Sequence, residues 1–497
     1  MKGKCIIIGS GLGGLACGGI LARNGYDVSV LEQGSQPGGC LQCFSRGGVR
    51  FETGMHFIGS ALPGQTLHRL MRYLGFDSVK LSRLDPEGYD VVKLGGESYR
   101  FANGREPFIS RMSEYFPAET DNIVAYYDLV QQVAAASSLH SLRSDDTDMV
   151  INTRYQTLSI NEVLECLTPD RQLRNVLAGT LPLYAARRGR TPFAQHAFIM
   201  DFYNRSAFRI EGGSDNIAKA LIANIRQAGG EVLTRNRVSR IFCDSRHATG
   251  VEVNGDTFLP ADYLIADIHP ARLMELLDSP LIRPATRRRM LSLPQTVGGF
   301  SVYVRFKENS VPYLNHNVYS YRSDSPWGCE DYSARDWPKG YLYMHFCDRD
   351  GAPYARSGVI LSYMNMADVA RWAGSAPGHR GVDYEAFKRA HADKLLECVE
   401  RDFPGLRQCI DGIWTSTPLT YRDYTGTEHG SMYGVARDIS LGPACRVAHR
   451  TRVPNLFLTG QNINSHGMLG VLVGAIVTCS ELLSPGEIYR QITEAGS

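Results

Sequence analysis

A glycine-rich turn after a short apolar run is the feature that most constrains this chain. Residues 5–8 read CIII, and Gly9, Gly11 and Gly14 follow them in the spacing G-x-G-x-x-G. In a nucleotide-binding βαβ unit the first glycine permits a tight turn, the second lets the backbone approach a pyrophosphate, and the third lets a helix lie close to the sheet. The helix that starts here would aim its N-terminus at the phosphates. The pattern therefore predicts a dinucleotide site near the start of the chain.

The residues after the turn complete this unit. Asn24-Gly25 ends the expected helix, and residues 27–31 alternate as a second strand. Glu32 follows at the place where an adenosine ribose needs a hydrogen-bond acceptor, and a carboxylate there disfavours a 2′-phosphate. A glycine-rich loop of no special purpose is the alternative interpretation, and the ordered strand, turn, helix and acid argue against it.

A second glycine pair distinguishes between cofactors. Gly38 and Gly39 complete the pattern E-x-x-x-x-x-G-G that begins at Glu32. This pattern resembles the FAD-binding signature of the glutathione-reductase-like flavoproteins and does not mark plain NAD dehydrogenases, so FAD is favoured over NAD. The chain has no second G-x-G-x-x-G, which argues against a dedicated NAD(P)H domain. NAD(P)H therefore remains open only as a transient reductant.

Composition limits which kinds of binding partner and which cellular compartment are expected. The 497 residues suffice for two or three domains, and the net charge of +2 gives no reason to expect nucleic acid. A small molecule is the expected partner. The 12 cysteines lack framework spacing, which suits a reducing cytoplasm. The uncharged run over 5–22 is too rich in glycine for a signal peptide or a membrane anchor.

Cys40 and Cys43 form a C-x-x-C directly after the glycine pair. Disulfide reductases with this type of nucleotide unit place their redox pair nearby but space it differently. No second C-x-x-C is present to complete a zinc site. Two ordinary buried thiols are therefore expected, and no metal.

The middle of the chain alternates between helical and extended patterns. Residues 61–142 are expected to be mostly helical, with helices at 65–75 and 121–135, and Ser159 opens a capping box. Residues 211–277 return to nucleotide-domain character, and 294–363 predict an antiparallel substrate sheet.

A basic and aromatic segment over 181–208 contains Arg187, Arg188 and Arg190. This segment has three alternative roles. It could line an apolar channel, lie on a membrane surface, or form the solvated edge of a core helix.

The C-terminal part supplies a second specific signal. Residues 453–461 read as a buried strand that ends in a glycine turn at Gly460, and a nearly all-apolar helix follows over about 469–483. Its N-terminus would point toward the cofactor, where the positive end of the helix dipole would stabilise an anionic reduced flavin.

Together these segments resemble the family of phytoene desaturases, carotenoid isomerases and retinol saturases, which are FAD-dependent oxidoreductases related to the amine oxidases. The likeness covers nearly the whole length and includes FETGMHFIG at 51–59, the segment 415–434, and VPNLFLTGQNINSHGMLGVLVGA at 453–475. The expected fold is α/β: a glutathione-reductase-like FAD-binding Rossmann domain with an inserted α+β substrate domain. The resemblance divides the chain into 1–60, 205–290 and 440–497 for the FAD domain, and 61–204 and 291–439 for the substrate domain.

The resemblance implies noncovalent FAD at the end of a long apolar tunnel. Around the ADP half it places Gly9, Gly11, Gly14, Glu32, Gly38, Gly39 and Val238, with Leu12, Gly13, Gln33 and Cys40 beside them. Around the flavin half it places Gly54, Met55, His56, Gly460, Gln461, Met468, Leu469, Gly470 and Val471. Two positions depart from the usual pattern, because many relatives have an acid where Gln461 stands and a basic residue where Cys40 stands.

The implied chemistry is hydride exchange between flavin N5 and a carbon-carbon double bond of an apolar polyene or isoprenoid-type lipid. Saturation, desaturation and isomerisation stay open. The candidate proton donors are His56, Tyr424, His429 and His466, with a structural role as the alternative for each. A cytoplasmic protein is expected, with a peripheral membrane contact as an open alternative and no indication of oligomeric state.

Three other functions compete with this interpretation. An amine-oxidase-like flavoenzyme and a fatty-acid double-bond isomerase would use the same scaffold. A flavin-free protein that binds prenyl lipids, as Rab GDP-dissociation inhibitors do, is the third, and Glu32 with Gly38 and Gly39 argues against it.

Overall fold

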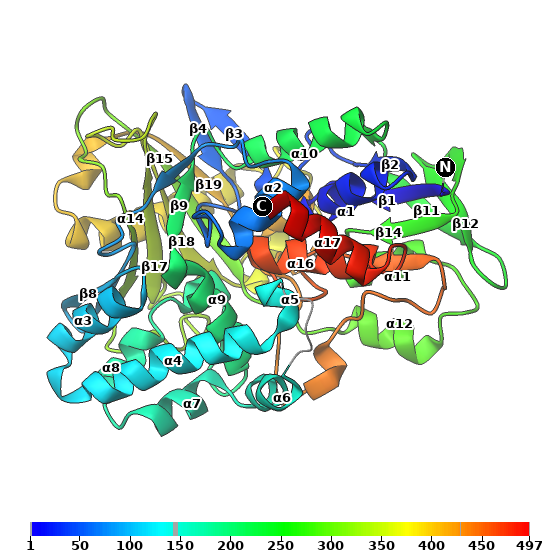
Figure 1. Cartoon of the computed structure of the whole chain (residues 1–497). Helices are drawn as coiled ribbons and strands as arrows, with labels where there is room; N and C mark the ends of the chain where they lie inside the picture. The colour runs from blue at the N-terminus through cyan, green and yellow to red at the C-terminus, as the bar shows by residue number, and fades with distance from the viewer. Residues whose placement is uncertain (1, 143–147, 428, 497) are drawn as a thin grey trace.

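The computed structural model describes residues 2–142, 148–427 and 429–496, and its elements gather around two sheets (Figure 1). The first is a five-stranded sheet in the order β10-β2-β1-β14-β20. Every neighbouring pair in it runs parallel. Its strands are β1 (Lys4–Ile8), β2 (Asp27–Leu31), β10 (Glu231–Leu233), β14 (Tyr263–Ala266) and β20 (Leu456–Leu458).

Both faces of this sheet are covered, as a parallel sheet requires. Cys5 and Ile7 of β1 pack into a core with three helices, whereas Ile6 and Ile8 pack into a core on the opposite face. The helices are α1 (Leu12–Arg23), α10 (Asp215–Gln227) and α16 (Gly467–Cys479). The opposite face carries an antiparallel sheet of β11 (Val238–Cys243), β12 (Ala248–Val253) and β13 (Thr257–Pro260).

Helix α1 forms despite four glycines, each of which disfavours a helix interior by about 1 kcal/mol relative to alanine. Tertiary packing is the reason. A Cβ on Gly14 would lie 2.3 Å from the carbonyl oxygen of Gly9, and a Cβ on Gly18 would lie 2.9 Å from Ile225 Cδ1. The glycines therefore let α1 approach both the sheet and α10, as the sequence predicted for Gly14.

The second sheet has seven strands in the order β19-β15-β18-β17-β16-β7-β8. The expectation of an antiparallel sheet over 294–363 is confirmed, because β15, β18, β17 and β16 pair antiparallel in that order. The one parallel pair joins β16 to β7, a strand outside that range. The expectation that 61–142 is mostly helical missed β7 and β8, a hairpin around Gly95-Gly96 that extends the sheet. A glycine pair between two alternating runs is a hairpin signal. The strands are β7 (Asp90–Leu94), β8 (Glu97–Phe101), β15 (Gly298–Phe306), β16 (Asn317–Tyr321), β17 (Gly340–Phe346), β18 (Ser357–Met364) and β19 (Ile410–Ser416).

Helices cover this sheet as well. One face packs against α3 (Arg105–Tyr115), α4 (Thr120–Ala136), α7 (Ile160–Leu167), α8 (Arg171–Leu177) and α9 (Phe193–Arg205), and the other against α14 (Val382–Asp402). The capping box at Ser159 is confirmed, because its side chain and that of Glu162 each accept a backbone N–H of the other residue.

The other strands and α-helices lie outside these layers. They are β3 (Cys43–Arg46), β4 (Val49–Glu52), β5 (Ile58–Gly59), β6 (Leu81–Arg83), β9 (Ala207–Ile210), α2 (Thr66–Leu74), α5 (Ser138–Ser141), α6 (Met149–Thr157), α11 (Pro270–Leu276), α12 (Pro284–Leu291), α13 (Met366–Val369), α15 (Pro418–Thr425) and α17 (Pro485–Gly496).

The three arginines of segment 181–208 pair with carboxylates. Arg187 lies 3.4 Å from Glu330, Arg188 lies 3.1 Å from Glu165, and Arg190 lies 3.5 Å from Asp438. This pattern is that of a solvated edge beside α9. In the part of the chain that the structure describes, no helix has both the length and the apolar character to cross a bilayer.

Candidate active site

A cavity of about 550 Å³ opens at the carboxyl ends of β1, β2 and β14, where parallel sheets of this kind bind ligands. We call it the nucleotide cavity. Most of the predicted cofactor contacts line it: Gly9, Gly11, Leu12, Gly13, Glu32, Gln33, Gly38, Gly39, Cys40, Gly54, Met55, Val238, Gly460, Gln461, Met468 and Val471.

Four predicted contacts do not line this cavity. Gly14 lies beneath it and serves the packing of α1. Gly470 is a packing glycine as well, since a Cβ there would lie 2.5 Å from the Cβ of Ser465. Leu469 packs beside the core under α16. His56 lies outside the lining, with its Nδ1 3.6 Å from the carboxylate of Glu52.

The glycine turn of the nucleotide cavity leaves room for a phosphate group. Gly9 has φ +99° and Gly39 has φ +54°, values that L side chains rarely adopt, and a Cβ on Gly39 would lie 3.1 Å from Gly11 Cα. Gly11, Leu12 and Gly13 at the start of α1 line the cavity, and the N–H of Gly14 in the same turn donates to Asp267. Glu32 and Val238 lie in the same lining, so the residues present fit a dinucleotide such as FAD.

One acidic residue beside the glycine turn was not among the predicted site residues. Asp267 follows β14, lines the cavity, and accepts a hydrogen bond of 2.8 Å from the N–H of Gly14. Burial, with a smaller contribution from the charge of Glu32, raises the pKa of Asp267 to about 6. A polar residue directly after a buried parallel strand lies at the ligand-binding edge, and that position was the available signal.

Glu32 already has partners on the protein. Its Oε2 accepts from the hydroxyl of Ser10 at 2.5 Å, and its Oε1 accepts from the N–H of Gly34 at 2.7 Å. Oε2 also accepts from the N–H of Ser10 at 3.2 Å. A carboxylate has about four lone-pair sites, so these three contacts orient Glu32 and leave about one site, on Oε1, for a ribose hydroxyl.

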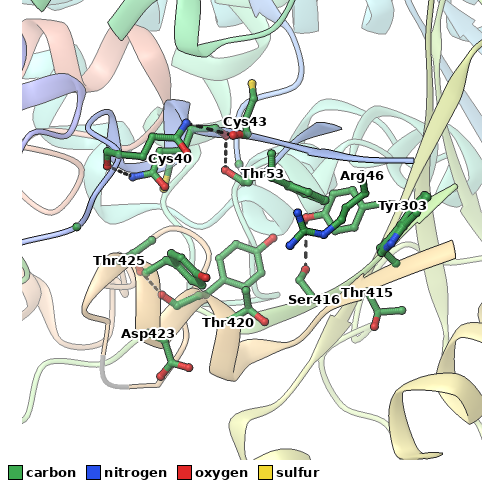
Figure 2. Close-up of a pocket in the computed structure, with 18 of the residues that line it drawn as sticks. Cys40, Cys43, Arg46, Thr53, Tyr303, Thr415, Ser416, Thr420, Asp423 and Thr425 are labelled. Carbon is green, nitrogen blue, oxygen red and sulfur yellow. Dashed lines mark hydrogen bonds between the residues drawn. The ribbon is translucent and has the colours of Figure 1, made fainter. Parts of the chain in front are cut away.

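A second cavity of about 1190 Å³ adjoins the first, and we call it the outer cavity (Figure 2). The two share nucleotide-side residues, among them Glu32, Gly39, Cys40 and Gly54, and also Tyr424. The outer cavity extends from there to the second sheet. Its aromatic lining comes from Phe44 of β3, Tyr303 of β15, Trp414 of β19 and Tyr421 of α15, which sequence reasoning did not identify.

The four candidate proton donors are dispersed. Tyr424 lines both cavities and is 64% exposed. His429 is exposed and outside both linings, and His56 lies between Glu52 and the ring of Phe346. The structure thus brings only Tyr424 of these four into contact with the two cavities.

His466 is buried directly before α16. Its Nε2 lies 2.7 Å from Gln195 Nε2, and its ring packs 4.7 Å from that of Tyr433, which lines the nucleotide cavity. Burial, with a smaller effect of Arg437, lowers the pKa of His466 to about 3. The imidazole is therefore neutral near pH 7, and an imidazolium at this position is not available as a proton donor.

Cys40 and Cys43 are free thiols, as predicted, although Cys40 is only half-buried by surface area. Burial raises the pKa of Cys40 to about 11, and Asp267 adds to the shift. We expect iodoacetamide at pH 7.5 to leave Cys40 largely unmodified, because the thiolate is the reactive form. The exposed Cys166 is the internal control and should be alkylated, as peptide mass spectrometry would show. Equal labelling of the two would contradict this assignment.

Comparison with known proteins places this geometry in a family. Residues 12–479 match the family model described as flavin containing amine oxidoreductase. The all-trans-retinol 13,14-reductase of Rattus norvegicus is 29% identical and aligns over 100% of this chain and 88% of its own length. A prolycopene isomerase of an Oncidium hybrid cultivar is 22% identical over 95% of this chain and 82% of its own.

A crystal structure of an oxidoreductase from Methanosarcina mazei has a TM-score of 0.65 and 16% identity, covering 96% of this chain and 100% of that one. Such similarity bears on the fold alone, and it agrees with the expected α/β class built on an FAD-binding Rossmann domain. The family model begins at the first residue of α1 and covers every strand of the two sheets except β1. The chain therefore belongs to the flavin-containing amine oxidoreductase family and is an FAD-dependent oxidoreductase.

Proposed function

We propose that this enzyme acts on a carbon-carbon double bond of an apolar polyene or isoprenoid-type lipid, with saturation as the reaction expected first. The full-length similarity to retinol reductases and the weaker one to prolycopene isomerases support the substrate class. The observation that carries the proposal is the pair of adjoining cavities, because Gly39, Cys40 and Gly54 line both. A ligand in the aromatic outer cavity would reach the nucleotide cavity at these residues.

We propose that Glu32 and Val238 hold the adenosine, that the turn at Gly11 and Gly13 holds the pyrophosphate, and that Gly54, Gln461 and Met468 surround the ring. When bound, FAD supplies a group that accepts and returns hydride. The N-terminus of α16, where Gly467 and Met468 line the cavity, adds partial positive charge on that side.

Side chains of the protein would position the lipid and deliver the proton to its double bond. The rings of Phe44 and Tyr303 lie 5.0 Å apart, edge to face, and form an apolar wall against which a polyene would lie. Burial raises the pKa of Tyr421 well above its usual value, which keeps its hydroxyl protonated. We propose Tyr424 as the first candidate proton donor, because it lines both cavities, and Tyr421 as the second.

The function is tested with the photoreduced holoenzyme under nitrogen, mixed in turn with retinol, a carotenoid and an unsaturated fatty acid. Saturation adds two hydrogen atoms to the product, which mass spectrometry detects, whereas isomerisation changes retention time without changing mass. Tyr424→Phe should slow product formation by roughly 10²-fold or more if this hydroxyl delivers the proton. Exposed Tyr354 lines neither cavity, and Tyr354→Phe is the matched control.

The amine-oxidase-like alternative is favoured by the family itself. It predicts hydrogen peroxide when the aerobic enzyme is given an amine. Peroxide release with a primary or secondary amine, and unchanged lipids in the anaerobic assay, would replace the proposal with this alternative.

Saturation also needs an electron donor and access to lipid. We propose NAD(P)H as the donor. Its binding would be transient, because the sequence has a single G-x-G-x-x-G and no dedicated domain for a second dinucleotide. We also propose a cytoplasmic enzyme in peripheral contact with a membrane, because the substrate partitions into lipid. Absence of the holoenzyme from sedimented anionic vesicles would contradict that contact.

A further inference from the structure

The outer cavity carries positive charge that the protein does not neutralise. Arg46, Arg237, Lys388 and Arg389 line it. Lys388 lies 2.9 Å from Glu385. Within the described ranges, no carboxylate lies within ion-pair distance of the other three side chains. These arginines come from β3, the segment before β11, and α14, so three separate elements direct guanidinium groups to one cavity.

The acids of the same lining are already engaged. Asp393 lies 2.8 Å from Arg407, and Asp423 pairs with Arg380 and Arg422. Glu32 accepts from Ser10 and Gly34, as described above. A single unpaired arginine on a protein surface is ordinary. Here every acid of the cavity lining already has another partner, so three arginines are free to bind an anionic ligand.

The outer cavity has an aromatic part and a cationic part. Phe44, Tyr303 and Tyr421 form an aromatic part, and the three arginines add a cationic part. Guanidinium groups bind phosphate oxygens with paired hydrogen bonds, and aromatic faces accept flat rings. A ligand with a flat ring joined to phosphates matches both parts, whereas a neutral polyene uses only the first.

We propose that the outer cavity binds a reduced nicotinamide dinucleotide, with its phosphates on Arg46, Arg237 and Arg389 and its nicotinamide among the aromatic residues. This inference rests on the proposed function, which requires a donor. The dinucleotide gives up a hydride and becomes the oxidised form, and FAD would hold that hydride equivalent until the lipid binds. The lipid double bond then gains one hydride and one proton, and the proposed donor Tyr424 recovers its proton from solvent. Donor and lipid share one cavity, so they bind in turn.

The binding test uses the photoreduced holoenzyme under nitrogen, so that the dinucleotide binds without giving up its hydride. Calorimetric titration measures the dissociation constants of NADPH and NADH for wild type and for the double variant Arg46→Gln/Arg389→Gln. Arg237 is left intact because it also lines the nucleotide cavity. Loss of one arginine-phosphate contact is worth about tenfold in affinity, so the double variant should bind roughly 10²-fold more weakly. Exposed Arg335, which lines neither cavity, supplies the control Arg335→Gln, with affinity expected to be unchanged.

Binding should also weaken with added salt in wild type and less steeply in the double variant. The proposal is overturned if wild type binds neither dinucleotide, or if the double variant binds as the control does. It is equally overturned if dinucleotide affinity is unaffected while the affinity for a long-chain fatty acid falls, because the arginines would then serve a lipid headgroup. Conversion of a polyene by dithionite-reduced holoenzyme requires no dinucleotide, so that assay separates failure of this inference from failure of the proposed function.

Discussion

Gly14→Ala should yield a colourless protein whose free energy of unfolding is lower by about 1–3 kcal/mol, the usual cost of overpacking. A Cβ at this position would lie 2.3 Å from the carbonyl oxygen of Gly9 and 3.1 Å from the Cβ of Asp267. The backbone would have to shift, and the shift would displace the glycine turn that lines the nucleotide cavity. Urea unfolding and the flavin absorbance of the purified protein measure the two effects.

Gly19→Ala is the matched control on the same helix. Nothing lies within 4 Å of a Cβ built on Gly19, so this variant should keep FAD and gain roughly 0.5–1 kcal/mol from the better helix propensity of alanine. A yellow Gly14→Ala protein of wild-type stability would show that α1 does not need this close approach to the sheet.

Asp267→Asn should strengthen FAD binding to the apoprotein, and the gain should grow with pH. The carboxylate lies among the turn residues, with Oδ2 accepting from the N–H of Gly14 at 2.8 Å, and an asparagine oxygen can accept the same bond. Below about pH 6 Asp267 is mostly protonated and neutral. Above that pH its negative charge opposes the pyrophosphate, so the pKa of Asp267 is higher with FAD bound than without it, and FAD binding takes up a proton.

Because FAD binding takes up a proton, FAD should bind more weakly as the pH rises. The dissociation constant of FAD in wild type should be flat below about pH 6 and should rise above it, by at most about tenfold per pH unit for one proton. Asp267→Asn should flatten the profile and bind roughly 10- to 100-fold more tightly at pH 8. Flavin fluorescence quenching measures both curves. Exposed Asp77 lines neither cavity, so Asp77→Asn should reproduce the wild-type slope. A wild-type curve that is flat from pH 5.5 to 8.5 would exclude this effect.

The nucleotide-binding half was predictable because its signals are local. G-x-G-x-x-G, Glu32 and Gly38-Gly39 lie within 31 consecutive residues, each fixed by a backbone or hydrogen-bonding requirement, and most of them line one cavity. Strand and helix bounds there agree with the predictions within a few residues. The C-terminal glycine turn and α16 were recognisable for the same reason.

The substrate half was less predictable because its geometry depends on distant segments. The pairing of β16 with β7 joins residues more than 200 positions apart, and no local pattern specifies it. Arg46, Tyr303 and Arg389 are likewise far apart in sequence and meet in one cavity only in the folded chain. The histidine candidates illustrate the same limit: residue type and proximity in sequence suggested His429 and His466, but one is exposed and the other lies buried behind Tyr433.

The central claim is that the enzyme transfers reducing equivalents to a conjugated lipid, and one anaerobic experiment tests it directly. Reduced holoenzyme is mixed with retinol or a carotenoid, and flavin and polyene absorbance are followed together. The account predicts that flavin absorbance returns as polyene absorbance is lost, with one double bond saturated per flavin reoxidised. Flavin that stays reduced while the polyene spectrum is unchanged would contradict it, and flavin that stays reduced while the spectrum only shifts would identify an isomerase instead.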